Sequence, residues 1–136
     1  MTTARQPFSN RDLHPKAREV LALLAYRLEL RYKAGLTKTL FKPFEGYRTP
    51  ERQDFLYTVQ KATKAKRWQS PHNYGLAVDF VPLSDASNMG SWDWSQDHDW
   101  DLLRREAHAL GLINTIAWDR PHVEHPIWLA IKGQVI

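Results

Sequence analysis

The sequence of 136 residues contains no cysteine. Disulfide bonds, zinc sites built from thiolates and a cysteine nucleophile are therefore excluded. Long apolar runs are absent as well, since the longest, around residues 20–24, is far shorter than the roughly 20 residues that cross a membrane. Residues 1–16 lack the apolar centre of a secretory signal peptide. We therefore expect the chain to be made in the cytoplasm, so that another agent must release it if its substrate lies outside the cell.

The composition is that of an ordinary globular protein. Apolar residues make up 43% and charged residues 25% of the chain, and a chain of this length has room for one core. We expect residues 1–136 to form a single monomeric domain without a separate binding module.

The net charge of +4 favours anionic partners such as nucleic acid, a membrane surface or the bacterial envelope. The densest basic cluster comprises Lys61, Lys64, Lys66 and Arg67. We interpret this cluster as a solvated helix end, because no motif for reading nucleic-acid grooves accompanies it. Nucleic-acid binding is kept only as an alternative.

Apolar spacing predicts helices and short strands in irregular order. One helix is expected over 15–33, ended by Gly35, and another from Thr49, each with a proline in its first turn. The buried face of the second is expected to comprise Phe55, Leu56 and Val59. A third helix is expected to begin near Asp97, to bury Trp100, Leu103, Ala107 and Leu110, and to end at Gly111.

Strands are expected over 37–44, 76–82, 113–118 and 122–129. Pro43 suits an edge strand, because proline cannot donate to a second neighbour. Strands and helices do not alternate regularly, so we predict a small α+β domain with an antiparallel sheet flanked by helices.

Two segments concentrate side chains that bind metals, namely 70–80 and 118–126. A catalytic zinc takes three ligands from His, Asp or Glu and keeps one position open for water. His72 and Asp79 can converge if the chain turns between them, and His122 would complete the set. A carboxylate in the apolar strand around Asp79 must be paired or metal-bound if that strand is buried.

These segments carry a known pattern. Ser70, His72, Gly75, Ala77 and Asp79 match the motif S-x-H-x-x-G-x-A-x-D, and a resembling second motif runs from Asp119 to His122. The chain thus resembles the D-alanyl-D-alanine carboxypeptidase and L-alanyl-D-glutamate endopeptidase family, which includes VanY-like and VanX-like enzymes and phage endolysins. The segment GYRTPERQDFLY (46–57) resembles a third stretch of this family. In detail the sequence is most similar to the endolysin branch.

The resemblance implies a Hedgehog/DD-peptidase-like fold and a zinc peptidase that cuts the stem peptide of peptidoglycan, at the L-alanyl-D-glutamate bond. His72, Asp79 and His122 would hold Zn²⁺. Asp119 would act as the general base that takes a proton from the attacking water, with a surface ion pair to Arg120 as its alternative.

Three further residues would serve the substrate or the site. Arg48 would clamp a substrate carboxylate or the charge of the tetrahedral intermediate, and a structural ion pair with Glu45 or Glu51 is the alternative. Gln53 would support Arg48 or the substrate. Ser70 would bind the substrate or hold the turn before His72.

Other side chains compete for these roles. His125 is an alternative ligand or a partner of one, and Glu124 shares a strand face with His122. An acidic run that includes one histidine could form a site for a hard cation, or it could place negative charge at the start of a helix. The run comprises Asp93, Asp97, His98, Asp99 and Asp101. Trp92, Trp94 and Trp100 are expected in the core, with a substrate groove as the alternative.

Three other functions remain open. The same chemistry would suit a D-alanyl-D-alanine carboxypeptidase. A zinc-binding module of the envelope without catalysis is a second possibility, although it would not need a base such as Asp119. A basic domain that binds nucleic acid or the envelope is the third.

Overall fold

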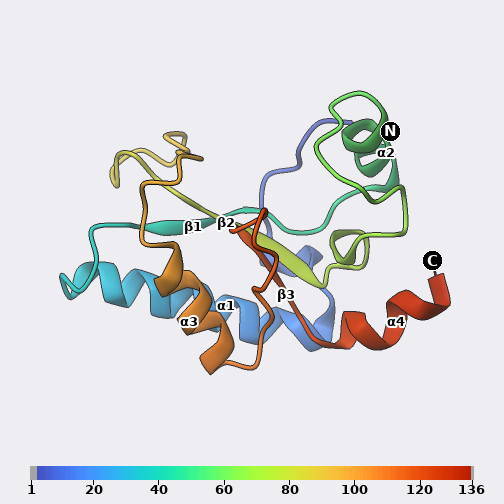
Figure 1. Cartoon of the computed structure of the whole chain (residues 1–136). Coiled ribbons are helices and arrows are strands. Elements are labelled where there is room, and N and C mark those ends of the chain that lie inside the picture. The colour runs from blue at the N-terminus through green and yellow to red at the C-terminus, as the bar shows by residue number, and fades with distance from the viewer. Residues whose placement is uncertain (1–2, 136) are drawn as a thin grey trace.

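A computed structural model describes residues 3–135 as a small α+β domain (Figure 1). Three strands form one antiparallel sheet in the order β1 (Phe41–Glu45), β2 (Ala77–Pro82), β3 (His122–Glu124). Four α-helices accompany it: α1 (Pro15–Lys33), α2 (Pro50–Thr58), α3 (Trp100–Ala109) and α4 (Ile127–Val135). Two short 3-10 helices are η1 (Asn10–Asp12) and η2 (Pro71–Tyr74). The predicted fold class is confirmed, and no helix of residues 3–135 is long and apolar enough to cross a membrane.

The core lies between the sheet and helices α1 and α3, which both lie on the same side of the sheet in Figure 1. Helix α1 buries Leu21, Leu24 and Leu28 at helical spacing, and β2 contributes Val78 and Phe80. The predicted helix over 15–33 and the predicted strand over 76–82, observed as Ala77–Pro82, are therefore confirmed.

Helix α2 begins as predicted, because the hydroxyl of Thr49 accepts the backbone N–H of Arg52. Its predicted buried face is wrong: Val59 is 64% exposed and lies beyond the helix end. The buried residue is instead Gln53, which is fully enclosed. Helix α2 lies away from α1 and α3 (Figure 1), so no apolar core covers its apolar side chains. It instead packs the polar side chain of Gln53 against Arg48.

The C-terminal strand prediction is wrong beyond Glu124. Residue Ile113 makes only an isolated bridge to Glu124, and the strand expected to reach residue 129 gives way to α4. Pro126 precedes this helix, and the ring of His125 accepts the N–H of Ile127 at 3.1 Å, as a helix cap would. Helix α3 likewise begins at Trp100 rather than near residue 97, because the Asp99 carboxylate caps it.

Strand β1 is an edge strand, as Pro43 predicted, but it covers 41–45 rather than 37–44. Its register with β2 shifts between Pro43 and Glu45, so that Glu45 faces Asp79 and Phe44 is the extra residue of a bulge. Bulges of this kind bend a strand and redirect side chains next to functional sites.

Candidate metal centre

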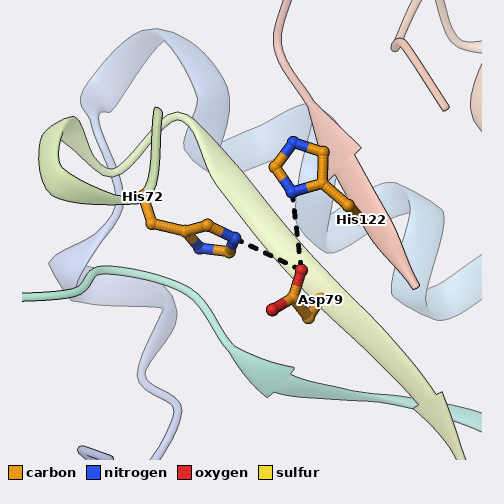
Figure 2. A group of neighbouring side chains, drawn as sticks. All are labelled: His72, Asp79 and His122. Carbon is orange, nitrogen blue, oxygen red and sulfur yellow. Dashed lines mark ion pairs between the residues drawn. The ribbon is translucent and has the colours of Figure 1, made fainter. Parts of the chain in front are cut away.

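The chain brings two histidines and one aspartate together from three separate elements. Figure 2 shows His72 of η2 and His122 of β3 both pointing toward Asp79 of β2. Atom Oδ1 of Asp79 lies 3.2 Å from Nε2 of His72 and 3.5 Å from Nδ1 of His122. One potential ligand atom from each residue lies within 4.8 Å of the others, a spacing that could hold a metal ion.

Local structure explains how the three meet. Asp79 and His122 are direct register partners in the antiparallel pair of β2 and β3. The turn into β2 passes through Gly75, whose φ of +69° is in the left-handed region and whose missing side chain makes room for the backbone of His14. Ser70 caps η2 by accepting the N–H of His72 at 3.2 Å, which is the turn-holding role that the sequence left open.

Both histidine rings are oriented by a second contact. Atom Nδ1 of His72 lies 2.8 Å from the carbonyl oxygen of Gly46, and Nε2 of His122 lies 2.8 Å from Oε1 of Glu124. If these nitrogens carry the protons, Nε2 of His72 and Nδ1 of His122 keep lone pairs directed at Asp79. Such outer contacts are typical of metal-binding histidines.

Glu124 therefore orients the candidate ligand His122 and is not itself one of the three clustered residues, a role that sequence reasoning missed. The signal was available, because residues two apart on a strand share a face. His125 lies outside the cluster: its backbone N–H donates to Leu76 at 2.8 Å and its ring caps α4.

The electrostatics of the centre suit a cation. Burial by itself would raise the pKa of Asp79, but the charge of His72 and contacts with both rings hold that pKa well below its usual value. Burial opposes a charge on His122, yet the Asp79 and Glu124 carboxylates raise its pKa from 6.5 to about 10. Atom Oδ1 of Asp79 is buried without a well-aligned hydrogen bond, so the residues present fit a metal ion that would satisfy this oxygen.

Asp119 is half-buried in the loop before β3, and its carbonyl accepts the N–H of His122 at 3.2 Å. Burial raises the pKa of its carboxyl group, and the nearby charge of Asp79 raises it further. Asp119 is not among the clustered ligands. A carboxyl group within electrostatic reach of the centre, with a raised pKa, suits proton transfer rather than metal binding.

Arg48 is buried beside the centre and forms the structural ion pair that the sequence kept as an alternative. Its Nη2 atom lies 3.0 Å from Oε1 of Glu45 and 3.6 Å from Oδ2 of Asp79, and its Nη1–H donates to Oε1 of Gln53 at 2.9 Å. Gln53 in turn donates to the carbonyl of Ala65 at 2.7 Å. Gln53 thus supports Arg48. Arg48 contacts Oδ2 of Asp79, whereas both histidines contact Oδ1.

The remaining sequence candidates lie elsewhere. Within residues 3–135, His72, Asp79 and His122 are the one group of three or more such side chains spaced to hold a metal, so the acidic run forms no second site of that kind. In that run the Asp99 carboxylate caps α3, and Oδ2 of Asp93 lies 3.0 Å from Nε2 of His98. Trp100 is in the core as expected, whereas Trp92 and Trp94 are outside the core cluster, which corrects the prediction for these two.

This chain is similar in sequence and in fold to known proteins. No family model matches the chain. It is 33% identical over 96 residues to the peptidoglycan L-alanyl-D-glutamate endopeptidase CwlK of Bacillus subtilis, a match that spans 59% of this chain and 57% of that protein. The crystal structure of the L-Ala D-Glu endopeptidase ChiX of Serratia marcescens superposes with a TM-score of 0.57 at 26% identity, over 95% of this chain and 92% of ChiX.

Proposed function

From the homology of this chain to the L-Ala-D-Glu endopeptidases CwlK and ChiX, of the VanY-like peptidase family, we propose that it is a zinc-dependent peptidoglycan hydrolase. Its proposed substrate is the L-alanyl-D-glutamate bond of the stem peptide. The observation that carries the proposal is the convergence of His72, Asp79 and His122, with both rings oriented from outside. The match covers 57% of the length of CwlK, less than two thirds of that protein.

Zinc is the proposed metal because the donor set comprises two imidazoles and one carboxylate. Imidazole nitrogen favours zinc and other transition metals, whereas calcium and magnesium prefer oxygen ligands alone. Three protein ligands leave a fourth position for water, as catalytic zinc sites require. When bound, zinc would polarise the scissile carbonyl and acidify the attacking water.

The chain's own residues would perform the proton transfers and hold the ligands in place. Asp119 would accept a proton from the attacking water and deliver it to the nitrogen of the departing D-glutamate. Arg48 would hold Asp79 in position through its contact with Oδ2, and its charge would favour the negative tetrahedral intermediate. Glu45 and Gln53 keep the guanidinium in place.

The test joins metal analysis to digestion. Purified peptidoglycan is incubated with protein of known zinc content, with and without a chelator, and new termini are identified by mass spectrometry. About one zinc per chain and chelator-sensitive cutting between L-alanine and D-glutamate would support the proposal. Release of free D-alanine instead would identify a carboxypeptidase, and zinc without any cleavage would identify a binding module.

The endolysin role, production in the cytoplasm and the monomeric state remain predictions of the sequence. A phage-type endolysin would lyse cells whose outer membrane has been opened, when added from outside. Absence of lysis together with cleavage of isolated muropeptides would instead favour an enzyme of wall turnover or recycling.

A further inference from the structure

Three aromatic side chains near the metal centre belong neither to the core nor to the proposed chemistry. Trp92 and Trp94 lie in the segment between β2 and α3, and Phe44 is the bulge residue of β1. The Phe44 ring meets Trp92 and Trp94 edge to face, with centroid distances of 5.0 and 4.8 Å. Trp94 is 50% exposed, and none of the three is in the core cluster. We call Phe44, Trp92 and Trp94 the aromatic platform.

The segment that carries the two tryptophans is tied to the sheet. Trp92 forms a bridge with Leu83, directly after β2. The N–H of Asp93 donates to the carbonyl of Pro82 at 2.9 Å, and the Asp93 carboxylate accepts the N–H of Ser95 at 3.0 Å. The platform is therefore held in place before any ligand arrives, which lowers the entropy lost on binding.

A cation accompanies the platform. The guanidinium carbon of Arg5 lies 4.1 Å from the centre of the Phe44 ring and 6.0 Å from that of Trp92. Arg5 donates one N–H to the carbonyl of Phe44 at 2.8 Å, and no acidic side chain in the described part of the chain pairs with it. Its other N–H groups are available to a ligand.

The platform lies close to the metal centre. Glu45, the neighbour of Phe44, is the register partner of Asp79 across a strand spacing of about 5 Å. Phe44 therefore lies on the order of 10 Å from Asp79, and Trp92, whose bridge partner Leu83 is four residues beyond Asp79, lies on the order of 13 Å from it.

These distances match the chemistry of the proposed substrate. In peptidoglycan the L-alanine of each stem is joined through a lactyl group to an N-acetylated amino sugar. The lactyl group and L-alanine together span about 7 Å, at about 3.5 Å per unit. A sugar on the platform would therefore leave the L-alanyl-D-glutamate bond within reach of the metal centre.

Resting on the proposed function, we propose that Phe44, Trp92, Trp94 and Arg5 bind the N-acetylated amino sugar that carries the stem. A sugar ring offers a face of C–H groups to an aromatic ring, and its acetamido oxygen accepts a hydrogen bond from a guanidinium. The combination of aromatic faces with one cation fits such a neutral, amphipathic ligand.

The test uses two substrates: a muramyl-linked tetrapeptide stem, and the same stem with an N-acetyl group in place of the muramyl group, which removes the sugar and its ether link but keeps an acyl group on L-alanine. We expect the zinc-loaded wild type to favour the muramyl substrate. Trp94→Ala should lower that preference in kcat/KM about tenfold, while the acetylated stem is cut at the wild-type rate. Trp94→Phe should retain most of the preference. Trp118→Ala removes an indole that is 67% exposed and serves as the matched control, which should keep the preference for the muramyl substrate.

A second measurement needs no cleavage. A tetramer of N-acetylglucosamine, titrated into the zinc-loaded protein and followed by tryptophan fluorescence, should bind the wild type and not Trp94→Ala. If no stem is cut but this difference persists, the proposed function fails and the sugar site stands. An unchanged preference in Trp94→Ala, or its loss in Trp118→Ala alone, overturns the sugar site. Self-association that Trp94→Ala abolishes, without any sugar effect, also overturns it in favour of a second copy of the chain.

Discussion

Atom Nε2 of His122 lies 2.8 Å from Oε1 of Glu124, two residues further along β3. The backbone of a strand brings these two side chains to one face, and the contact directs the other ring nitrogen at Asp79. Glu124 is therefore a positioning residue for His122, the proposed metal ligand.

We expect Glu124→Ala to weaken zinc binding by about 10- to 100-fold, because the ring loses its orientation and part of its basicity. Glu124→Gln should have a smaller effect, since its amide oxygen can accept the same N–H. Competition with a chelator of known affinity measures both. Glu29→Gln, which alters a carboxylate paired with Lys33 and Lys42, is the control. Wild-type affinity in Glu124→Ala would show that other contacts hold the ring.

Zinc should stabilise the folded protein through its ligands. In the wild type, free zinc at 100 times the dissociation constant should add about 2.7 kcal/mol to the free energy of unfolding. His72→Ala and Asp79→Ala should contain no stoichiometric zinc and show no such gain, as measured by elemental analysis and thermal unfolding. His108→Ala, at an exposed position of α3, should behave as the wild type. Unchanged zinc content in either ligand variant would mean that the ligands are wrongly assigned.

Asp119→Asn should keep its zinc and lose turnover by about 10²- to 10⁴-fold, because it removes the proposed base. The base must be ionised, so the wild-type rate should fall as pH drops through the pKa of Asp119. Burial and the charge of Asp79 raise that pKa in the metal-free protein, whereas a bound cation lowers it, so the pH at which the rate falls reports the balance of these effects. Asp101→Asn, on the exposed face of α3, is the control. Full activity in zinc-loaded Asp119→Asn would exclude it as the base.

Zinc binding should release a proton from His122. Its pKa of about 10 in the metal-free protein means that the ring is charged at pH 7, whereas a ligand must be neutral. Zinc affinity should therefore rise with pH, up to tenfold per unit, until the ring deprotonates by itself. Calorimetry in two buffers of different ionisation enthalpy should report about one proton released near pH 7. No difference between the buffers would mean that His122 is already neutral.

Gln53→Ala should destabilise the metal-free protein by about 1–3 kcal/mol, because it leaves buried groups of Arg48 and Ala65 without partners. Urea unfolding measures the loss. Gln60→Ala, at an exposed position just after α2, should be neutral. A neutral Gln53→Ala would indicate that water replaces the lost hydrogen bonds.

Some elements followed from the sequence because their causes are local. The helix over 15–33 was readable from its apolar spacing, and the central strand from the alternation around Asp79. Helix α4 was missed, because its short apolar run is compatible with a strand, and the proline before it was not read as a helix start. The buried face of α2 was misjudged, because apolar residues near a helix end are buried only if a partner covers them.

The sequence by itself determined which side chains are suited to hold a metal, since His72, Asp79 and His122 stand in a specific pattern of residue types and spacings. Only the tertiary structure decided how they are held. The carbonyl that lies against His72 belongs to Gly46, 26 residues earlier in the chain, and Arg48 reaches Asp79 only because β1 and β2 pair. It also decided that Trp92 and Trp94 meet Phe44 outside the core. Contacts of this kind depend on sheet register and packing between distant segments, which no local pattern of residues encodes.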